Sequence, residues 1–513
     1  MQENRKTISY LNTKKWYKTL KVINICFVFC SIFIGLISCI TFLIDGQDNV
    51  NFFLKALLII GIFLVFYIIS EVPKRIFYSL WGVPESKSIH SKTILISGIL
   101  CLIFLSAVIT TMILPFGFNT KKFTITDESP VGSTQFVKAL SGLTNSPIQY
   151  GDEVVPIDTV DRFLPILLSG IDNAKTSINF TTFAWADGPF SEKVFSSLIK
   201  SAKRGVQVRL LLDALGSHGL SQKNIKLLED AGGRVEKYHE FNMLDPVQYN
   251  SRDHMRSIVI DGEIGFTGGM GITDDWLSKK PGKKFQDMMF EFKGTMAQSL
   301  QNTFNKNWNT VTGEVLNGSS FYPSVPFSND NSFIGITSIP SEDYQPVRDA
   351  FMLTMLSAKK KLYIVNPYII PDEGMLMVLE DKAREGVDVR IVSPGPISDA
   401  PLMRMVWHTN YERLLASGVK IYEYQPSMIH TKFIIADDVW SLVGSANIDN
   451  RSESINNENI MGIVDEKLAS TLDKTFTVYL KDSKEFTLDV WKKENNFLKN
   501  IYSKMLLILF KQY

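Results

Sequence analysis

A histidine, a lysine and an aspartate stand close together late in the chain, and their types suit chemistry on an anion. His430, Lys432 and Asp437 have the spacing H-x-K-x4-D, and Asn447 follows in the segment Gly-Ser-Ala-Asn. Successive side chains of a β-strand point to opposite faces, so His430 and Lys432 are predicted to share one face. The segment therefore predicts an imidazole, an ammonium group and an amide around one substrate.

The same spacing occurs a second time, earlier in the chain. His254, Arg256 and Asp261 follow it with arginine in place of lysine, and Gly271 stands where the other copy has Asn447. The chain has six histidines, so two matches to one spacing are well above the noise of short motifs. An ordinary half-buried histidine is the interpretation that we accept for the remaining four, which are His90, His218, His239 and His408.

Two histidines surrounded by cations suit the cleavage of a phosphodiester. Such an ester is anionic and resists attack, so its site needs positive charges and hydrogen-bond donors at the phosphate oxygens. One neutral imidazole can attack phosphorus while a second, protonated imidazole gives its proton to the leaving alcohol. The expected intermediate is a phosphohistidine. The predicted phosphate-binding residues are Lys432, Arg256, Asn447 and Ser445.

The chain around these two segments is itself duplicated. Residues 202–212 recur in type as 383–393, each an amphipathic helix end closed by glycine and followed by an apolar strand. Residues 174–183 recur as 358–367. Strands that alternate with helices predict an α/β lobe, a mixed sheet flanked by helices, used twice. Two such lobes packed about a pseudo-two-fold axis would bring the two histidines face to face.

The duplication sets the expected domain boundaries. The first lobe is expected at 119–315, a linker at 316–338 and the second lobe at 339–513. The linker prediction depends on a stretch rich in Asn, Ser, Pro and Gly. The tail at 497–513 carries an apolar run too short to cross a bilayer. It either lies at the membrane interface as an amphipathic helix or covers a lobe.

Three long apolar runs occupy the first 118 residues. They lie at about 22–44, 52–70 and 94–114, and each is long enough for the roughly 20 residues that cross a bilayer. Residues 1–118 are therefore predicted to be an all-α anchor of three transmembrane helices. Lysines and arginines gather before the first run and between the second and third, which predicts a cytoplasmic N-terminus and an extracytoplasmic catalytic domain.

The composition argues against several other classes of protein. The formal net charge is +1, with 54 basic and 53 acidic residues, so no nucleic-acid partner is indicated. All four cysteines lie inside the apolar runs, which leaves the rest of the chain without a thiolate metal site or a disulfide framework. No dense cluster of His, Asp and Glu stands out in the sequence, and neither a metal nor another cofactor is expected.

With these motifs the sequence resembles the phospholipase D superfamily, and in particular its bacterial cardiolipin synthase branch. The resemblance covers residues 150–480 and includes 268–276, 422–430 and 444–452, followed by Asn-Glu at 457–458. It implies a multi-pass enzyme of the bacterial cell membrane that converts two phosphatidylglycerol molecules into cardiolipin and glycerol. No cofactor is implied, and the partners are the phospholipid substrate and the membrane.

The resemblance also implies roles for individual residues. His254 would be the nucleophile and His430 the acid and then the base, although the sequence alone allows the two roles to be exchanged. A histidine of this kind needs a carboxylate that fixes its tautomer. Glu458 is the expected partner of His254, and Asp274 or Asp275 is the expected partner of His430.

Asp261 and Asp437 complete the motif and are counted with the catalytic residues, but stabilisation of the hairpin is the stronger interpretation for both. The chain also departs from the family pattern. Arg256 is bulkier than lysine, Gly271 removes a donor, and the stretch 285–287 reads Phe-Gln-Asp where relatives often have Trp-Arg-Asp. These departures put the efficiency of the first half-site in question.

Two other functions stay open on the sequence. A phospholipid hydrolase of the same fold would use the same catalytic residues and let water take the phosphatidyl group. Arg256 and Gly271 would alternatively mark a weakened site in a lipid-binding membrane scaffold. The intact His430, Lys432 and Glu458 argue against the scaffold.

Overall fold

The computed structural model describes residues 123–127, 129–151, 153–240, 250–277, 284–326, 331–339 and 344–495. The chain divides into two units, 1–116 and 117–513, and the fold given below belongs to the second. The three predicted transmembrane helices and the predicted amphipathic tail lie outside the described residues. Among the helices of the described ranges, none combines the length and the apolar character needed to cross a membrane.

A seven-stranded mixed sheet forms the first lobe. Its strands are β2 (Val155–Ile157), β3 (Ser177–Thr182), β4 (Gln207–Asp213), β5 (Arg234–Tyr238), β6 (Ser257–Ile260), β7 (Ile264–Gly268) and β8 (Met289–Lys293). They lie in the order β2-β8-β7-β6-β3-β4-β5. Strands β3, β4 and β5 run parallel, and the pairs from β3 to β2 are antiparallel.

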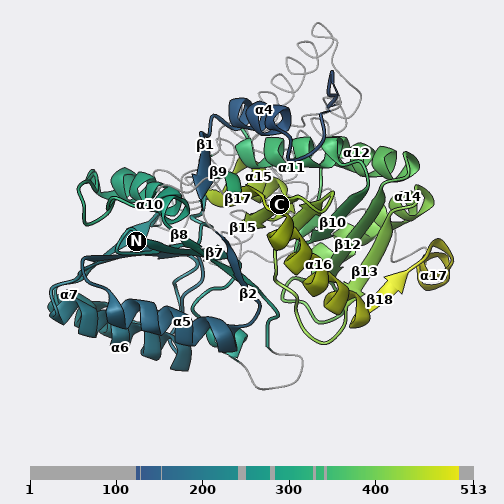
Figure 1. Cartoon of the computed structure of the whole chain (residues 1–513). Coiled ribbons are helices and arrows are strands. Elements are labelled where there is room, and N and C mark those ends of the chain that lie inside the picture. Colours follow the sequence, from purple (N-terminus) through teal and green to yellow (C-terminus); the bar gives the residue numbers. More distant parts are fainter. Residues whose placement is uncertain are drawn as a thin grey trace, which may run out of the picture. The chain divides into compact units, whose positions relative to one another are not determined.

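Helices cover both faces of this sheet (Figure 1). One face carries α5 (Val160–Asn173), α6 (Pro189–Lys203) and α7 (Gln222–Asp230), and the other carries α10 (Thr295–Thr312). In α5 the buried residues follow the spacing of one helix face, and the Thr159 side chain caps the N-terminus by accepting from the Arg162 N–H. The short α9 (Asp274–Leu277) follows the β6–β7 hairpin.

A nine-stranded mixed sheet forms the second lobe. Its strands are β1 (Ile148–Gly151), β9 (Asn331–Ser338), β10 (Lys361–Val365), β12 (Asp388–Pro394), β13 (Lys420–Tyr424), β14 (Phe433–Ala436), β15 (Trp440–Gly444), β17 (Glu458–Val464) and β18 (Ser483–Phe486). Their order is β1-β9-β17-β15-β14-β10-β12-β13-β18. A separate two-stranded sheet joins β11 (Ile369–Ile370) to β16 (Ile448–Asp449).

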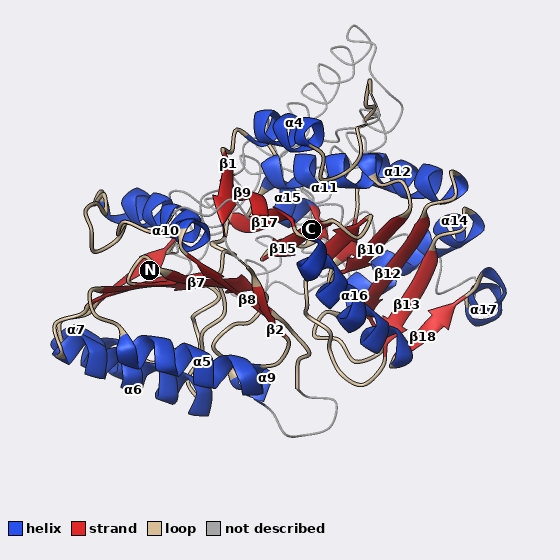
Figure 2. Ribbon diagram, in the orientation of Figure 1, coloured by secondary structure: helices blue, strands red, loops and turns tan. Residues whose placement is uncertain are grey.

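Helices again lie on both faces of the sheet (Figure 2). One face packs against α4 (Thr134–Thr144), α11 (Pro346–Ser357), α12 (Glu373–Arg384) and α14 (Tyr411–Ala416), and the other packs against α16 (Glu466–Lys481). Three shorter helices are α13 (Pro401–Trp407), α15 (Asn450–Ser454) and α17 (Leu488–Glu494), and His408–Asn410 forms a 3-10 turn. Along β10, Leu362 and Ile364 join the core under α11 and α12, whereas Tyr363 and Val365 join the core under α16.

The predicted duplication is confirmed by the order of the strands. The series β8-β7-β6-β3-β4-β5 in the first sheet corresponds to β17-β15-β14-β10-β12-β13 in the second. Gly205 and Gly386 follow α6 and α12 with φ of 92° and 93°, so both close their helices in the left-handed conformation that glycine tolerates. The two lobes also share one core, in which Phe290 and Phe292 of the first lobe meet residues such as Phe433 of the second. Full burial of a phenylalanine contributes about 1.5–3 kcal/mol.

Two details differ from the expected boundaries. Strand β9 lies inside the segment 316–338, which was predicted to be a linker, and β1 pairs with it although 148–151 was assigned to the first lobe. The polar composition of 310–338 hid the strand, because Phe333, Ile334 and Ile336 are its only large apolar residues, all of them buried, and its other positions are polar or small. The second sheet is therefore built partly from chain that precedes the predicted second lobe.

The two motif aspartates form the turns of equivalent hairpins. Asp261 follows β6 and Asp437 follows β14, with φ of 56° and 51°. The Asp261 carboxylate accepts the backbone N–H groups of residues 175–177 before β3. The Asp437 carboxylate accepts those of residues 359–361 before β10. Each aspartate thus links its hairpin to the neighbouring strand of the sheet. A four-residue strand separates each aspartate from its motif histidine, which agrees with the structural interpretation.

Candidate active site

The two motif histidines lie where the lobes meet. The His254 N–H donates to the carbonyl oxygen of Asn457 at 3.0 Å, and the His430 N–H donates to the carbonyl oxygen of Gln286 at 2.7 Å. Each bond joins the segment before one hairpin to the segment that enters a strand of the opposite lobe, β17 or β8. The backbone of each histidine is therefore fixed by the other lobe.

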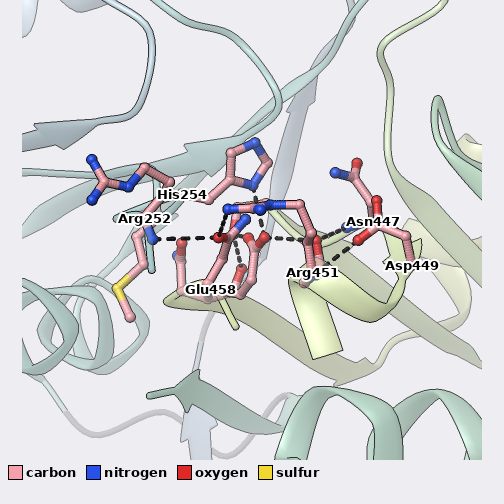
Figure 3. Close-up of polar contacts among 12 residues, drawn as sticks. Arg252, His254, Asn447, Asp449, Arg451 and Glu458 are labelled. Carbon is pink, nitrogen blue, oxygen red and sulfur yellow. Dashed lines mark hydrogen bonds and ion pairs between the residues drawn. The ribbon is translucent and has the colours of Figure 1, made fainter. Parts of the chain in front are cut away.

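Each imidazole is also held by a carboxylate of the opposite lobe. Nδ1 of His254 lies 2.7 Å from Oε1 of Glu458, and Nδ1 of His430 lies 2.8 Å from Oδ2 of Asp287. Figure 3 shows His254 turned toward Glu458. Where the carboxylate is ionised and accepts the proton of Nδ1, the lone pair of Nε2 is available for chemistry. The two halves of the site are thus arranged reciprocally.

Glu458, the predicted carboxylate partner of His254, contacts that histidine in the structure. The prediction for His430 was wrong. Asp287 takes the place expected for Asp274 or Asp275. Asp274 instead accepts the N–H of Phe190 at the start of α6, and Asp275 is exposed and bonds within its own turn. The duplication could have indicated Asp287 as the partner of His430. Asp287 stands just before β8 in the first lobe, and Glu458 begins the corresponding strand, β17, in the second lobe.

Further contacts hold the two carboxylates in place. Trp276 Nε1 donates to Oδ2 of Asp287 at 3.0 Å, and Ser452 Oγ donates to Oε1 of Glu458 at 2.7 Å. Asp449 caps α15 by accepting the Ser452 N–H, so the helix end aims the serine at Glu458 (Figure 3). Trp276 and Ser452 end the segments 268–276 and 444–452 that carry the family resemblance, but the sequence did not indicate their contacts with the two carboxylates.

Ser445 has a different contact from the predicted one. Its hydroxyl donates to Oε2 of Glu458 at 2.5 Å and accepts the N–H of Asn459 at 3.0 Å. Both bonds direct the hydroxyl at the carboxylate rather than at a phosphate. Ser445 is therefore a positioning residue for Glu458 in this structure.

The two motif cations occupy equivalent positions. Lys432 Nζ donates to the carbonyl oxygen of His430 at 2.8 Å, and Arg256 Nη1 donates to the carbonyl oxygen of His254 at 2.6 Å. The Lys432 nitrogen also lies 3.2 Å from each ring nitrogen of His430. The two residues are only 4% and 2% exposed. Arginine therefore keeps the place of the lysine and supplies the same charge.

Asn447 and Gly271 make the two halves unequal. The Oδ1 atom of Asn447 is buried and has no hydrogen-bond partner in the part of the chain that the structure describes, which leaves the amide available to a ligand. A Cβ atom at Gly271 would lie 2.8 Å from both the oxygen and the Cβ atom of Ala184, and 3.2 Å from Trp276. An asparagine does not fit there, so the missing donor has a packing cause.

Burial sets the protonation of both histidines. Loss of hydration lowers the pKa of His254 well below its ordinary value, and the nearby Arg256 and Lys432 lower it further. Burial also lowers the pKa of His430, followed by Lys432, while Asp287 opposes the shift. The imidazoles are therefore neutral near pH 7, and His430 is the one whose carboxylate partner favours the protonated form.

Burial acts on the surrounding charges as well. It raises the pKa of Glu458 to about 8, against the opposing effects of the Ser445 hydroxyl and Arg256. It lowers the pKa of Lys432 to about 7, while Asp287 acts in the opposite direction. An anionic phosphate beside Lys432 would favour the charged ammonium, so ligand binding is expected to be accompanied by protonation. Within the described ranges, no group of three or more His, Cys, Asp or Glu side chains has a metal-binding arrangement.

Asp287→Asn tests the observed partner of His430. The amide can present its NH₂ group to Nδ1 and favour the wrong tautomer, so kcat for a phosphodiester substrate should fall about 10³- to 10⁴-fold. Asp275→Asn is the matched control, because it makes the same chemical change at an exposed position, and it should stay within about twofold of wild type. Steady-state rates of the full-length protein in detergent decide, and a large loss in the control alone would contradict the assignment.

The pH dependence should report Lys432. Because its folded-state pKa is lowered to about 7, the ammonium is lost as pH rises, and kcat/KM for an anionic substrate should decline by about tenfold per pH unit above that value. Lys432→Arg keeps the charge to high pH, and its profile should lose this alkaline limb even if its rate is lower. An unchanged alkaline limb in the variant would show that another group causes it.

The chain is similar to known proteins both in sequence and in fold. The family model described as "Cardiolipin synthase, PLD-like domain" matches residues 167–308 and 352–479. Cardiolipin synthase 1 of Bacillus cereus is 31% identical over 361 residues, which cover 68% of this chain and 69% of that protein. Cardiolipin synthase 2 of Staphylococcus epidermidis is 31% identical over 342 residues, which cover 65% and 69%.

A solved structure has the same fold. Phosphatidylserine synthase of Haemophilus influenzae superposes with a TM-score of 0.58 at 15% identity, covering 74% of this chain and 97% of that one. One family match falls in each lobe and includes that lobe's histidine. The chain therefore belongs to the phospholipase D superfamily, in its bacterial cardiolipin synthase branch.

Proposed function

We propose that the protein is a membrane-bound phosphatidyltransferase that converts two phosphatidylglycerol molecules into cardiolipin and glycerol. The observation that carries the proposal is the reciprocal pairing of His254 with Glu458 and of His430 with Asp287. This pairing prepares two imidazoles at one site, and Arg256 and Lys432 bring positive charge to both. The names of the similar proteins support phospholipid as the substrate class.

The first half of the reaction forms a phosphohistidine. Nε2 of His254 attacks the phosphorus of one phosphatidylglycerol, and the bond from phosphorus to the glycerol oxygen breaks. His430, which takes up a proton on Nε2 when the anionic substrate binds, gives that proton to the glycerol oxygen. Arg256, Lys432 and Asn447 supply charge and a hydrogen-bond donor to the phosphate oxygens as the negative charge moves onto them. Free glycerol leaves.

The second half returns the enzyme to its first state. The terminal hydroxyl of a second phosphatidylglycerol gives its proton to His430 and attacks the phosphorus, and the bond from phosphorus to His254 breaks. One phosphodiester replaces another, so the reaction needs no nucleotide energy source. The order of roles is supported by the surroundings of each ring: burial and the nearby Arg256 and Lys432 lower the pKa of His254 well below its ordinary value, whereas Asp287 opposes the lowering of the pKa of His430.

The equivalent contacts of Arg256 and Lys432 favour an enzyme over a scaffold. Each donates to the carbonyl oxygen of its own motif histidine, so the substitution in the first half leaves a cation in place. The close approach of Ala184 to Gly271 removes the second argument for a decayed site, because glycine is the residue that fits.

The membrane arrangement is part of the proposal. Three transmembrane helices at about 22–44, 52–70 and 94–114 would anchor the enzyme in the bacterial cell membrane, with the lobes outside the cytoplasm. This arrangement places the site next to a substrate that diffuses within the bilayer. The proposal for the anchor depends on the apolar runs and on the charges between them.

Phosphatidylglycerol labelled in both its acyl and glycerol parts tests the activity. The full-length protein in detergent should yield cardiolipin and glycerol in equal amounts, and His254→Ala and His430→Ala should each lose at least about 10³-fold in rate. His218→Ala is the control, because this histidine is exposed and outside the site. Phosphatidic acid as the product would indicate a hydrolase, and no turnover in wild type or in Arg256→Lys would favour the scaffold.

Cysteine labelling tests the orientation. Ser319 is exposed in the loop after α10, and all four native cysteines lie in the first 118 residues. A membrane-impermeant maleimide should therefore label Ser319→Cys in intact cells well above the background of wild type. Labelling only after lysis would place the catalytic lobes in the cytoplasm and overturn the predicted topology.

A further inference from the structure

Tyr368 and Asp399 lie together at one edge of the second sheet. Tyr368 follows β10, and Asp399 lies in the loop that follows the neighbouring parallel strand β12. Ligands of α/β sheets commonly bind beyond the carboxyl ends of the parallel strands. The Tyr368 hydroxyl donates to Oδ2 of Asp399 at 2.5 Å, while Oδ1 of Asp399 makes no hydrogen bond to a described residue. The pair thus presents a free acceptor at this edge.

The pair is next to His430. The rings of Tyr368 and His430 meet edge to face with centroids 6.0 Å apart. Asp399 is close enough to Lys432 to raise the pKa of its ammonium group, although burial dominates there. Burial raises the pKa of Tyr368 well above its ordinary value, with Asp399 adding to the effect, so the hydroxyl stays protonated and can donate.

In the first lobe a different side chain lies beside the histidine. Phe183 follows β3 there, with its ring centroid 5.1 Å from that of His254. Asp213 ends β4 but is fully buried, and its oxygens accept the backbone N–H groups of residues 215, 216 and 253. Beside His254 the side chain that follows β3 is therefore a phenyl ring, whereas beside His430 the side chains that follow β10 and β12 are a phenol and a carboxylate.

This asymmetry matches a difference between the two steps at the histidines. His430 protonates the departing glycerol oxygen and later deprotonates the entering hydroxyl, so both alcohols occupy its side of the phosphorus. Their remaining hydroxyl groups lose water on binding and need partners. We propose that Tyr368 and Asp399 form the alcohol subsite, in which they bind the free hydroxyls of a glycerol headgroup beside His430. This inference rests on the proposed phosphatidyl transfer.

A competition between two alcohols tests the subsite. The full-length protein in mixed micelles receives phosphatidylglycerol labelled in its phosphatidyl part, with equal concentrations of ¹³C-glycerol and 1-propanol, which lacks the two further hydroxyls. Mass spectrometry gives the ratio of ¹³C-phosphatidylglycerol to phosphatidylpropanol. Both products come from the same phosphohistidine, so the ratio depends on the second step alone.

Wild type should favour glycerol, because a site built to bind hydroxyl groups rejects an analogue without them. Tyr368→Phe and Asp399→Asn should each move the ratio toward phosphatidylpropanol by about tenfold or more. Asp230→Asn makes the same change at an exposed aspartate at the end of α7 and should leave the ratio unchanged. Thermal unfolding identifies any variant that is not folded.

The outcomes separate this inference from the proposed function. Equal use of the two alcohols by wild type, or a wild-type ratio in both folded variants, would overturn the subsite while leaving phosphatidyl transfer intact. Failure of wild type to form any product with either alcohol, while phosphatidic acid accumulates, would overturn the transfer itself and the subsite with it. A shifted ratio in the two variants, with the control unchanged, supports both.

Discussion

The crossed pairing of imidazoles and carboxylates between the lobes is the interaction on which the site depends. The nitrogen of each histidine that acts as nucleophile or base is Nε2. A carboxylate of the other lobe contacts Nδ1 and must fix the tautomer that leaves Nε2 free. Backbone bonds beside the same residues hold the two segments in register. Neither lobe therefore contains a working half-site of its own. The core that the two lobes share under β8 and β14 holds the two halves of the site together.

The pairing buries several charged groups together, and this burial shifts their pKa values. A buried charge is strongly destabilised unless it has partners. Here two cations and two carboxylates surround two imidazoles within a few ångströms. Burial, followed by the nearby cations, lowers the pKa of both imidazoles, and burial also brings the pKa of Lys432 and of Glu458 close to neutrality. The site is thereby prepared for an anion that restores the charge on the lysine.

The two halves differ in ways that follow from packing. Ala184 lies against Gly271, while the second lobe combines Asn447 with Tyr368. The departures from the family pattern fall on both sides: Arg256 lies beside His254, whereas Phe285 and Gln286 lie beside His430. A duplicated lobe has in this way acquired two unequal half-sites around one phosphorus.

The sequence by itself determined the repeated α/β lobes, both histidines and both cations, because strand alternation, helix endings and motif spacing are local properties, and the family resemblance added Glu458. Only the tertiary structure decided that Asp287 faces His430, that Ser445 turns to Glu458 and that β9 completes the second sheet. The His254–Glu458 and His430–Asp287 contacts join residues 204 and 143 positions apart. Such contacts are set by how two buried surfaces pack, and no local pattern records that packing.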